Sequence, residues 1–162
     1  MNTPHPTSTD SDTDVHATAM RRVNRLLGHY GASHTQPANE LIHYLAIPAI
    51  MLSLSGLIYA VHPWLAYAFI AASLVYYAQL STVFLLAMVA ITLGMLAIVR
   101  WMDHAGFLVT GCVTIFVVAW IFQFIGHKLE GKKPSFFEDI QYLWVGPLFV
   151  LSKLFLKIGV RW

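Results

Sequence analysis

The chain has 162 residues, of which 57% are hydrophobic and only 11% charged, with a formal net charge of +2 at pH 7. So small a charge gives no indication of a nucleic-acid partner, and a single cysteine excludes an intramolecular disulfide. Residues 41–99 and 104–127 contain no Asp, Glu, Lys or Arg. Because a charged side chain at the centre of a bilayer costs roughly 2.5–3.5 kcal/mol, these runs favour a membrane protein over a soluble domain.

The N-terminal segment differs in composition from the rest of the chain. Residues 1–18 are rich in Thr, Ser and Asp and lack the apolar core of a secretory signal peptide, so we expect a disordered tail there. Residues 19–162 are expected to form a single membrane-embedded helical domain. It begins with a short amphipathic helix over residues 20–30.

The first membrane span is expected to begin near Pro37 and to end near Ala60. Proline suits the first turn of a helix, where its missing N–H is not needed. Pro48 lies inside this span, where a proline kinks a helix or marks a local break. His62 and Pro63 then indicate a turn.

The apolar segment of residues 64–99 is long for one span and short for two, since ~20 residues cross the hydrocarbon core. We expect two short helices that separate near residues 79–81. A polar loop is then expected over residues 100–104, followed by a fourth span over residues 105–126.

The C-terminal part is less apolar. Residues 127–134 are basic, and residues 136–158 include two acidic residues and two lysines. This last stretch suits a fifth span broken at Gly146 and Pro147, or a pair of helices lying in the membrane interface. The expected fold class is therefore all-α, a polytopic membrane bundle of four spans with one of these two C-terminal arrangements.

Basic residues indicate the orientation of the bundle. They cluster before the first span and after the fourth, and an even number of spans places both clusters on one side of the membrane. The positive-inside rule makes that side cytoplasmic. The residues concerned are Arg21, Arg22, Arg25, Lys128, Lys132 and Lys133.

Polar residues gather at the same two positions, the start of the first span and the end of the fourth. Asn39 and His43 are four residues apart and share a helix face, and so do Gln123, His127 and Glu130, at spacings of four and three. His34 lies in the loop just before the first span. Three imidazoles and a carboxylate can therefore converge at one end of the bundle, a donor set that suits a first-row transition metal.

Other interpretations of these residues stay open at this point. Each histidine can be a hydrogen-bonded group at the membrane interface, and Glu130 can be a solvated loop charge. His43 and His127 on facing helices can be axial ligands of a haem in an electron carrier. The protein can also be a non-catalytic scaffold or a small transporter. His29 lies close enough to join the cluster, whereas His62 and His104 are expected at the opposite face of the membrane.

Two motifs carry a resemblance to a known family. Residues 33–48 contain the pattern H-x4-N-x3-H-x4-P, and residues 120–134 and 146–150 provide matching segments in the second half. The chain resembles, over residues 20–158, a family of 2-hydroxy fatty acid dioxygenases long known as a domain of unknown function. Its typical member is the fungal endoplasmic-reticulum enzyme of phytosphingosine breakdown.

The resemblance implies an Fe(II)-dependent oxygenase that shortens a long-chain 2-hydroxy fatty acid by one carbon with dioxygen and without 2-oxoglutarate. His34, His43 and His127 match the family's histidines, with Glu130 as a fourth ligand or a base beside the metal. Asn39 and Gln123 match accompanying polar positions that orient the imidazoles. The implied location is a membrane, either the bacterial inner membrane or the endoplasmic reticulum, with the site at the cytoplasmic face and its substrate among membrane lipids.

Overall fold

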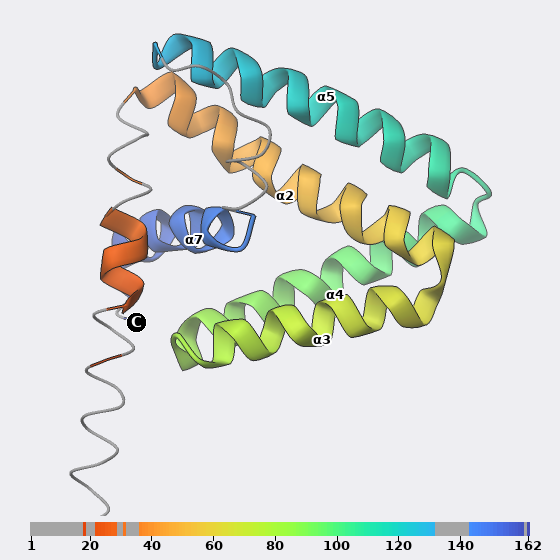
Figure 1. The fold of residues 1–162 in the computed structure, drawn as a ribbon, viewed down its shortest axis with the longest axis horizontal. Helices are drawn as coiled ribbons and strands as arrows, with labels where there is room; N and C mark the ends of the chain where they lie inside the picture. Colours follow the sequence, from red (N-terminus) through yellow and green to blue (C-terminus); the bar gives the residue numbers. More distant parts are fainter. Residues whose placement is uncertain (1–17, 19–21, 29–30, 32–35, 132–142, 161) are drawn as a thin grey trace, which may run out of the picture.

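The described part of the chain is helical throughout. The computed structural model describes residues 18, 22–28, 31, 36–131, 143–160 and 162, among which there is no strand. His34, His29 and almost all of the expected tail lie outside these residues. The main helices are α2 (Pro37–Val61), α3 (Pro63–Ala78), α4 (Thr82–His104), α5 (Leu108–Leu129) and α7 (Val145–Ile158) (Figure 1).

One residue ends α2 and begins α3. Pro37 occupies the first turn of α2, as predicted, and the helix continues through Pro48 to Val61. His62 then adopts an extended backbone, with φ −164° and ψ 127°. Its Nδ1 accepts a hydrogen bond of 3.3 Å from the backbone N–H of Trp64, which satisfies an otherwise unpaired donor in the first turn of α3. The predicted turn at this position is confirmed.

The predicted break between α3 and α4 is also confirmed. Residues 79–81 separate the two helices, and the Ser81 hydroxyl accepts a 3.2 Å hydrogen bond from the backbone N–H of Val83 at the start of α4. Ser81 therefore has the position and geometry of an N-cap.

The predicted polar loop over residues 100–104 is wrong, because those residues form the last turn of α4. Arg100 and Asp103 are exposed there, and a helix end that reaches water accepts charges without unwinding. The helix ends instead before Gly106, whose φ of 77° is a conformation that glycine adopts without strain. The next helix is displaced accordingly: α5 begins at Leu108 and ends at Leu129, rather than spanning residues 105–126.

The helices form two antiparallel pairs. In Figure 1, α2 lies alongside α5 and α3 lies alongside α4, and the two pairs approach each other near His62 and diverge at the other end. There α7 fills the space between them. Its Leu148 and Phe155 join a buried cluster with Tyr77 and Phe84 from the second pair. The start of α2 and the end of α5 consequently lie at the same end of the molecule.

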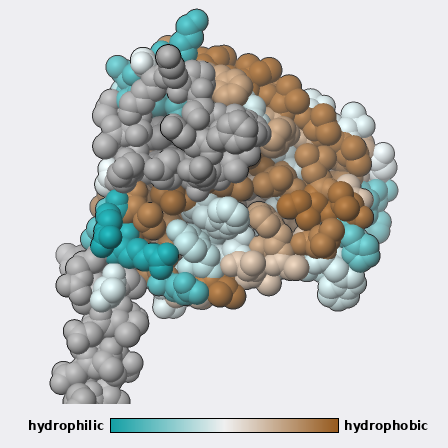
Figure 2. Space-filling view, in the orientation of Figure 1, coloured by the Kyte–Doolittle hydropathy of each residue, from teal (hydrophilic) through white to brown (hydrophobic). Residues whose placement is uncertain are grey.

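The surface of the bundle is apolar over much of its area. Figure 2 shows hydrophobic side chains over most of the described face and hydrophilic ones toward its edges. By length and composition α2, α4 and α5 are long enough to cross a membrane, whereas the apolar α3 has 16 residues. These helices indicate association with a membrane. A total of four spans stays a prediction.

The C-terminal helix is too short to span a membrane by itself. At 1.5 Å per residue, the 14 residues of α7 extend about 21 Å, less than the ~30 Å hydrocarbon core. Its Lys153 and Lys157 face the start of α2, where Glu40 and Tyr44 lie. The choice between a broken fifth span and a pair of interfacial helices stays a prediction. Residues 132–142 lie outside the described part.

The arrangement predicts which loops share a side of the membrane. Single cysteines replacing Gln36 and Lys128, in a Cys112→Ser background, should react with an impermeant maleimide from the cytoplasmic side only. A cysteine replacing Ala105, at the other end of α4, should react from the opposite side only. Labelling of positions 36 and 128 from opposite sides would refute the four-span topology.

The close packing of α2 on α5 gives a stability prediction. A Cβ at Gly56 would lie 2.3 Å from the Sγ of Cys112, whereas a Cβ at Gly94 on α4 would meet nothing within 4 Å. Gly56→Ala should therefore destabilise the protein by about 1–3 kcal/mol through overpacking. Gly94→Ala should be neutral or stabilising by up to about 1 kcal/mol. Thermal unfolding in detergent measures both.

A second substitution tests the cause of that loss. Replacing Cys112 by alanine removes the sulfur that obstructs the new methyl group, so adding Cys112→Ala should restore much of the stability lost in Gly56→Ala. Equal stability of the Gly56→Ala and Gly94→Ala proteins would show that the close approach is absent.

Candidate functional site

The site begins with a close approach of α2 and α5 at their polar ends. Gly126 on α5 faces Asn39 on α2, and a Cβ at Gly126 would lie 2.3 Å from the Asn39 Oδ1. A glycine leaves room here for the Asn39 side chain, and small residues commonly allow such close approach between membrane helices. Polar side chains of both helices meet in this contact.

Four polar side chains are buried in this contact. The exposed fraction is 0% for Asn39 and His43, 4% for Gln123 and 8% for His127. Burial of polar groups is unfavourable unless they are hydrogen-bonded or bind a ligand. The partners of these four groups therefore decide what the site can do.

A carboxylate joins the ends of the two helices. Glu130 follows the last residue of α5, and its Oε2 accepts hydrogen bonds from the Asn39 Nδ2 at 3.0 Å and from the Gln36 backbone N–H at 3.1 Å. Hydrogen bonds to an ionised group are stronger than neutral ones, and a negative charge is stabilised at a helix N-terminus. Glu130 therefore fixes the start of α2 against the end of α5.

The two described histidines of the site are in direct contact. The ring centroids of His43 and His127 are 5.4 Å apart, at an interplanar angle of 87°. The His43 Nδ1 lies 2.9 Å from the backbone oxygen of Asn39. A carbonyl oxygen only accepts, so Nδ1 carries the proton, and in the neutral ring the lone pair is on Nε2. This arrangement is typical of a histidine that binds a metal.

Two amide oxygens in the same contact are unsatisfied. The Oδ1 of Asn39 and the Oε1 of Gln123 are buried and have no hydrogen-bond partner among the residues that the structure describes. A buried acceptor without a donor costs about 1–3 kcal/mol. An unsatisfied acceptor on the same helices as the two histidines indicates a place for a hydrogen-bond donor, such as a water molecule or a ligand hydroxyl.

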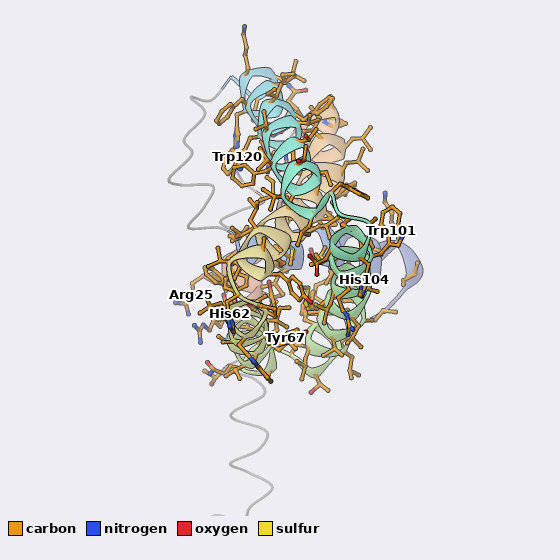
Figure 3. The ribbon with its side chains drawn as sticks, turned by 90° about the vertical axis from the view of Figure 1, so that its right-hand side faces the viewer. Arg25, His62, Tyr67, Trp101, His104 and Trp120 are labelled. Atoms are coloured by element: carbon orange, nitrogen blue, oxygen red, sulfur yellow. The ribbon has the colours of Figure 1, made fainter. Side chains whose placement is uncertain are left out.

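The structure brings five of the six predicted site residues to one end of the bundle: Asn39, His43, Gln123, His127 and Glu130. The sixth, His34, is outside the described residues. Within the described ranges no group of three or more His, Cys, Asp or Glu is arranged to hold a metal. The assignment of ligands therefore stays a prediction. His62 and His104 lie at the ends of α2 and α4, away from the start of α2, and Figure 3 labels both in a view onto that end of the bundle.

A second polar cluster beside the site was not predicted. The Lys153 Nζ on α7 lies 3.2 Å from the Glu40 Oε1 on α2, and the Tyr44 hydroxyl donates a hydrogen bond to the same carboxylate. The Lys157 Nζ lies 5.8 Å from the centroid of the Tyr44 ring. The four-residue spacing of Glu40 and Tyr44 was a visible signal, but their partners on α7 are far away in the sequence. The cluster attaches α7 to α2.

Comparison with known proteins gives two consistent matches. A family model described as 2-hydroxy-palmitic acid dioxygenase Mpo1-like matches residues 20–158. The chain is also 30% identical over 141 residues to the 2-hydroxy-palmitic acid dioxygenase MPO1 of Saccharomyces cerevisiae, an alignment that covers 82% of this chain and 79% of the yeast protein. No solved structure matches.

Exchanging the amide of Asn39 and the carboxylate of Glu130, which are hydrogen-bonded, tests the contact between the helices. Asn39→Asp places a second carboxylate against Glu130 and should lower the stability by about 2 kcal/mol, from the lost bond and the like-charge contact. Adding Glu130→Gln restores a donor and an acceptor in reversed order. The double variant should recover at least half of the loss in thermal unfolding. If it is no more stable than Asn39→Asp alone, the two side chains do not interact.

Proposed function

We propose that this chain, which belongs to the Mpo1-like family of 2-hydroxy-palmitic acid dioxygenases, oxidatively shortens long-chain 2-hydroxy fatty acids by one carbon at the membrane edge. The observation that carries this proposal is the buried pair of His43 and His127, placed beside two unsatisfied amide oxygens in an apolar bundle. Such a site offers metal ligands and a hydrogen-bond acceptor to a substrate with a polar head and an apolar tail.

We further propose that Fe(II) is held by His34, His43 and His127. The donor chemistry of the described residues fits this ion, because imidazoles bind first-row metals and the His43 tautomer is fixed by a backbone carbonyl. His34 is two residues from Gln36 in the sequence. The backbone N–H of Gln36 donates a hydrogen bond to the Glu130 carboxylate at this end of the bundle. When bound, Fe(II) would supply the redox chemistry with dioxygen that amino-acid side chains do not provide.

The remaining site residues then have distinct tasks. The Asn39 carbonyl orients the His43 ring, and the Gln123 Oε1 accepts a hydrogen bond from the substrate hydroxyl. Glu130 acts as a positioning residue, because its Oε2 already accepts two hydrogen bonds that fix α2 against α5. We therefore assign Glu130 a positioning role rather than that of a fourth iron ligand.

The geometry argues against the haem alternative. Two axial histidines of a haem lie on opposite faces of a planar macrocycle. The rings of His43 and His127 instead form an edge-to-face pair with centroids 5.4 Å apart, within the ordinary range for aromatic rings in contact. There is no gap between them for a macrocycle.

The proposed function predicts which histidines matter. His34→Ala, His43→Ala and His127→Ala should each lose bound iron and lose production of the one-carbon-shorter acid from 2-hydroxypalmitate. An incomplete ligand set leaves the ion too few donors. His104→Ala is the matched control, because His104 is exposed at the other end of the bundle, and it should retain both. Metal analysis of the purified protein and mass spectrometry of the products measure the two properties.

Two outcomes would contradict the proposal. Full iron retention in all three variants would refute the ligand assignment. A folded, iron-loaded wild-type protein that yields no shortened acid across several chain lengths would refute the reaction.

A further inference from the structure

We propose that an apolar groove between α2 and α5 binds the alkyl chain of the 2-hydroxy fatty acid, an inference that rests on the function proposed above. The groove has a volume of about 490 Å³, within the range of small-molecule sites. Its lining includes three alanines and three larger side chains, namely Ala46, Ala49, Ala119, Leu45, Val118 and Phe122.

Small side chains form the floor of this groove and large ones form its walls. Ala46 and Ala119 are buried where the two helices meet, whereas Leu45, Val118 and Phe122 are exposed on either side. The lining positions recur on both helices with helical spacing, so the groove follows the helix axes. A channel of this shape suits a linear chain better than a compact ligand.

The lining offers almost no polar group. Among the ten residues that line the groove, only Thr114 carries a polar side chain, and its hydroxyl donates a 2.8 Å hydrogen bond to the backbone oxygen of Thr110. That hydroxyl is satisfied within its own helix. The groove therefore favours a hydrocarbon occupant, because a polar group placed there would lose its hydrogen bonds.

One end of the groove lies next to the polar site along both helices, although no described residue of the site lines it, and this proximity selects the occupant. Ile42 lines the groove and precedes His43, while Phe122 lines it and precedes Gln123. The Gln123 Oε1 is buried and unsatisfied within the described part of the chain. A single amphiphile can thus place its hydroxyl at Gln123 and its alkyl chain along the groove. An ordinary lipid chain would fill the groove but leave that acceptor unsatisfied.

Two neighbouring valines provide a matched test. Val118 lines the groove and is 45% exposed, whereas Val117 is 50% exposed and does not line it. Val118→Trp should lower kcat/KM for 2-hydroxypalmitate about tenfold or more, because the indole would occupy the space that the alkyl chain needs and overpack the groove. It should change kcat/KM for 2-hydroxyoctanoate about twofold or less. Val117→Trp should leave both values near those of the wild type.

A binding experiment separates this proposal from the proposed reaction. A 2-hydroxypalmitate carrying a diazirine on its terminal carbons is bound to the iron-loaded protein in detergent and photolysed, and the labelled residues are identified by mass spectrometry. Labels should fall on the groove residues, and unlabelled 2-hydroxypalmitate should compete at least tenfold better than palmitate. Val118→Trp should abolish the labelling, and Ala49→Leu, which narrows the far end, should shift or abolish it.

The outcomes are distinguishable. Labelling with this selectivity supports the groove even if no shortened acid forms, in which case only the proposed reaction fails. Labels outside the groove, or equal competition by palmitate, would overturn the groove as a substrate site and leave it as a general lipid contact. Equal chain-length profiles for Val118→Trp and Val117→Trp would overturn it as well.

Discussion

The close approach of α2 and α5 is the constraint on which the other features depend. Gly56 and Gly126 lie toward opposite ends of this pair, and each faces a side chain of the partner helix at a distance that no Cβ allows. A side chain at either position would force the facing side chain or the helices to shift. A shift at Gly126 would disturb the contact of Asn39 with Glu130. Packing of small residues thus positions the polar groups, rather than the reverse.

At the polar end of the α2–α5 pair, some of the buried polar groups hydrogen-bond to one another, and these bonds stabilise the contact. Asn39 uses its amide N–H for Glu130 and its backbone oxygen for His43, which links three site residues through one side chain and one carbonyl. The amide oxygens of Asn39 and Gln123 are left unsatisfied in the described part of the chain. Unsatisfied groups are unfavourable in an apolar environment, and they persist in functional sites where a ligand supplies the missing donor.

The sequence predicted the features that depend on local spacing. Pro37, His62 and Ser81 mark helix ends through their own backbone and side-chain chemistry, and residues four apart, such as Asn39 and His43, share a face in any helix. The predicted end of α4 before residue 100 is wrong, because exposed charges such as Arg100 do not end a helix. The pairing of Glu40 with Lys153 depends on how α7 packs between the helix pairs, and no local pattern contains that information. The ligand role of His34 also lies beyond what the described residues test.

The two faces of α2 make separate contacts, and this division places the buried polar site beside an apolar groove. One face, with Glu40 and Tyr44, is covered by α7, which also fills the space between the two helix pairs. The other face, with Asn39 and His43, contacts α5 and borders the apolar groove. Because α7 lies at the opposite face, no described helix covers the groove side of the α2–α5 pair. Under the proposed function, this arrangement would let a substrate with an alkyl chain approach from the membrane and bring its polar head toward the histidines.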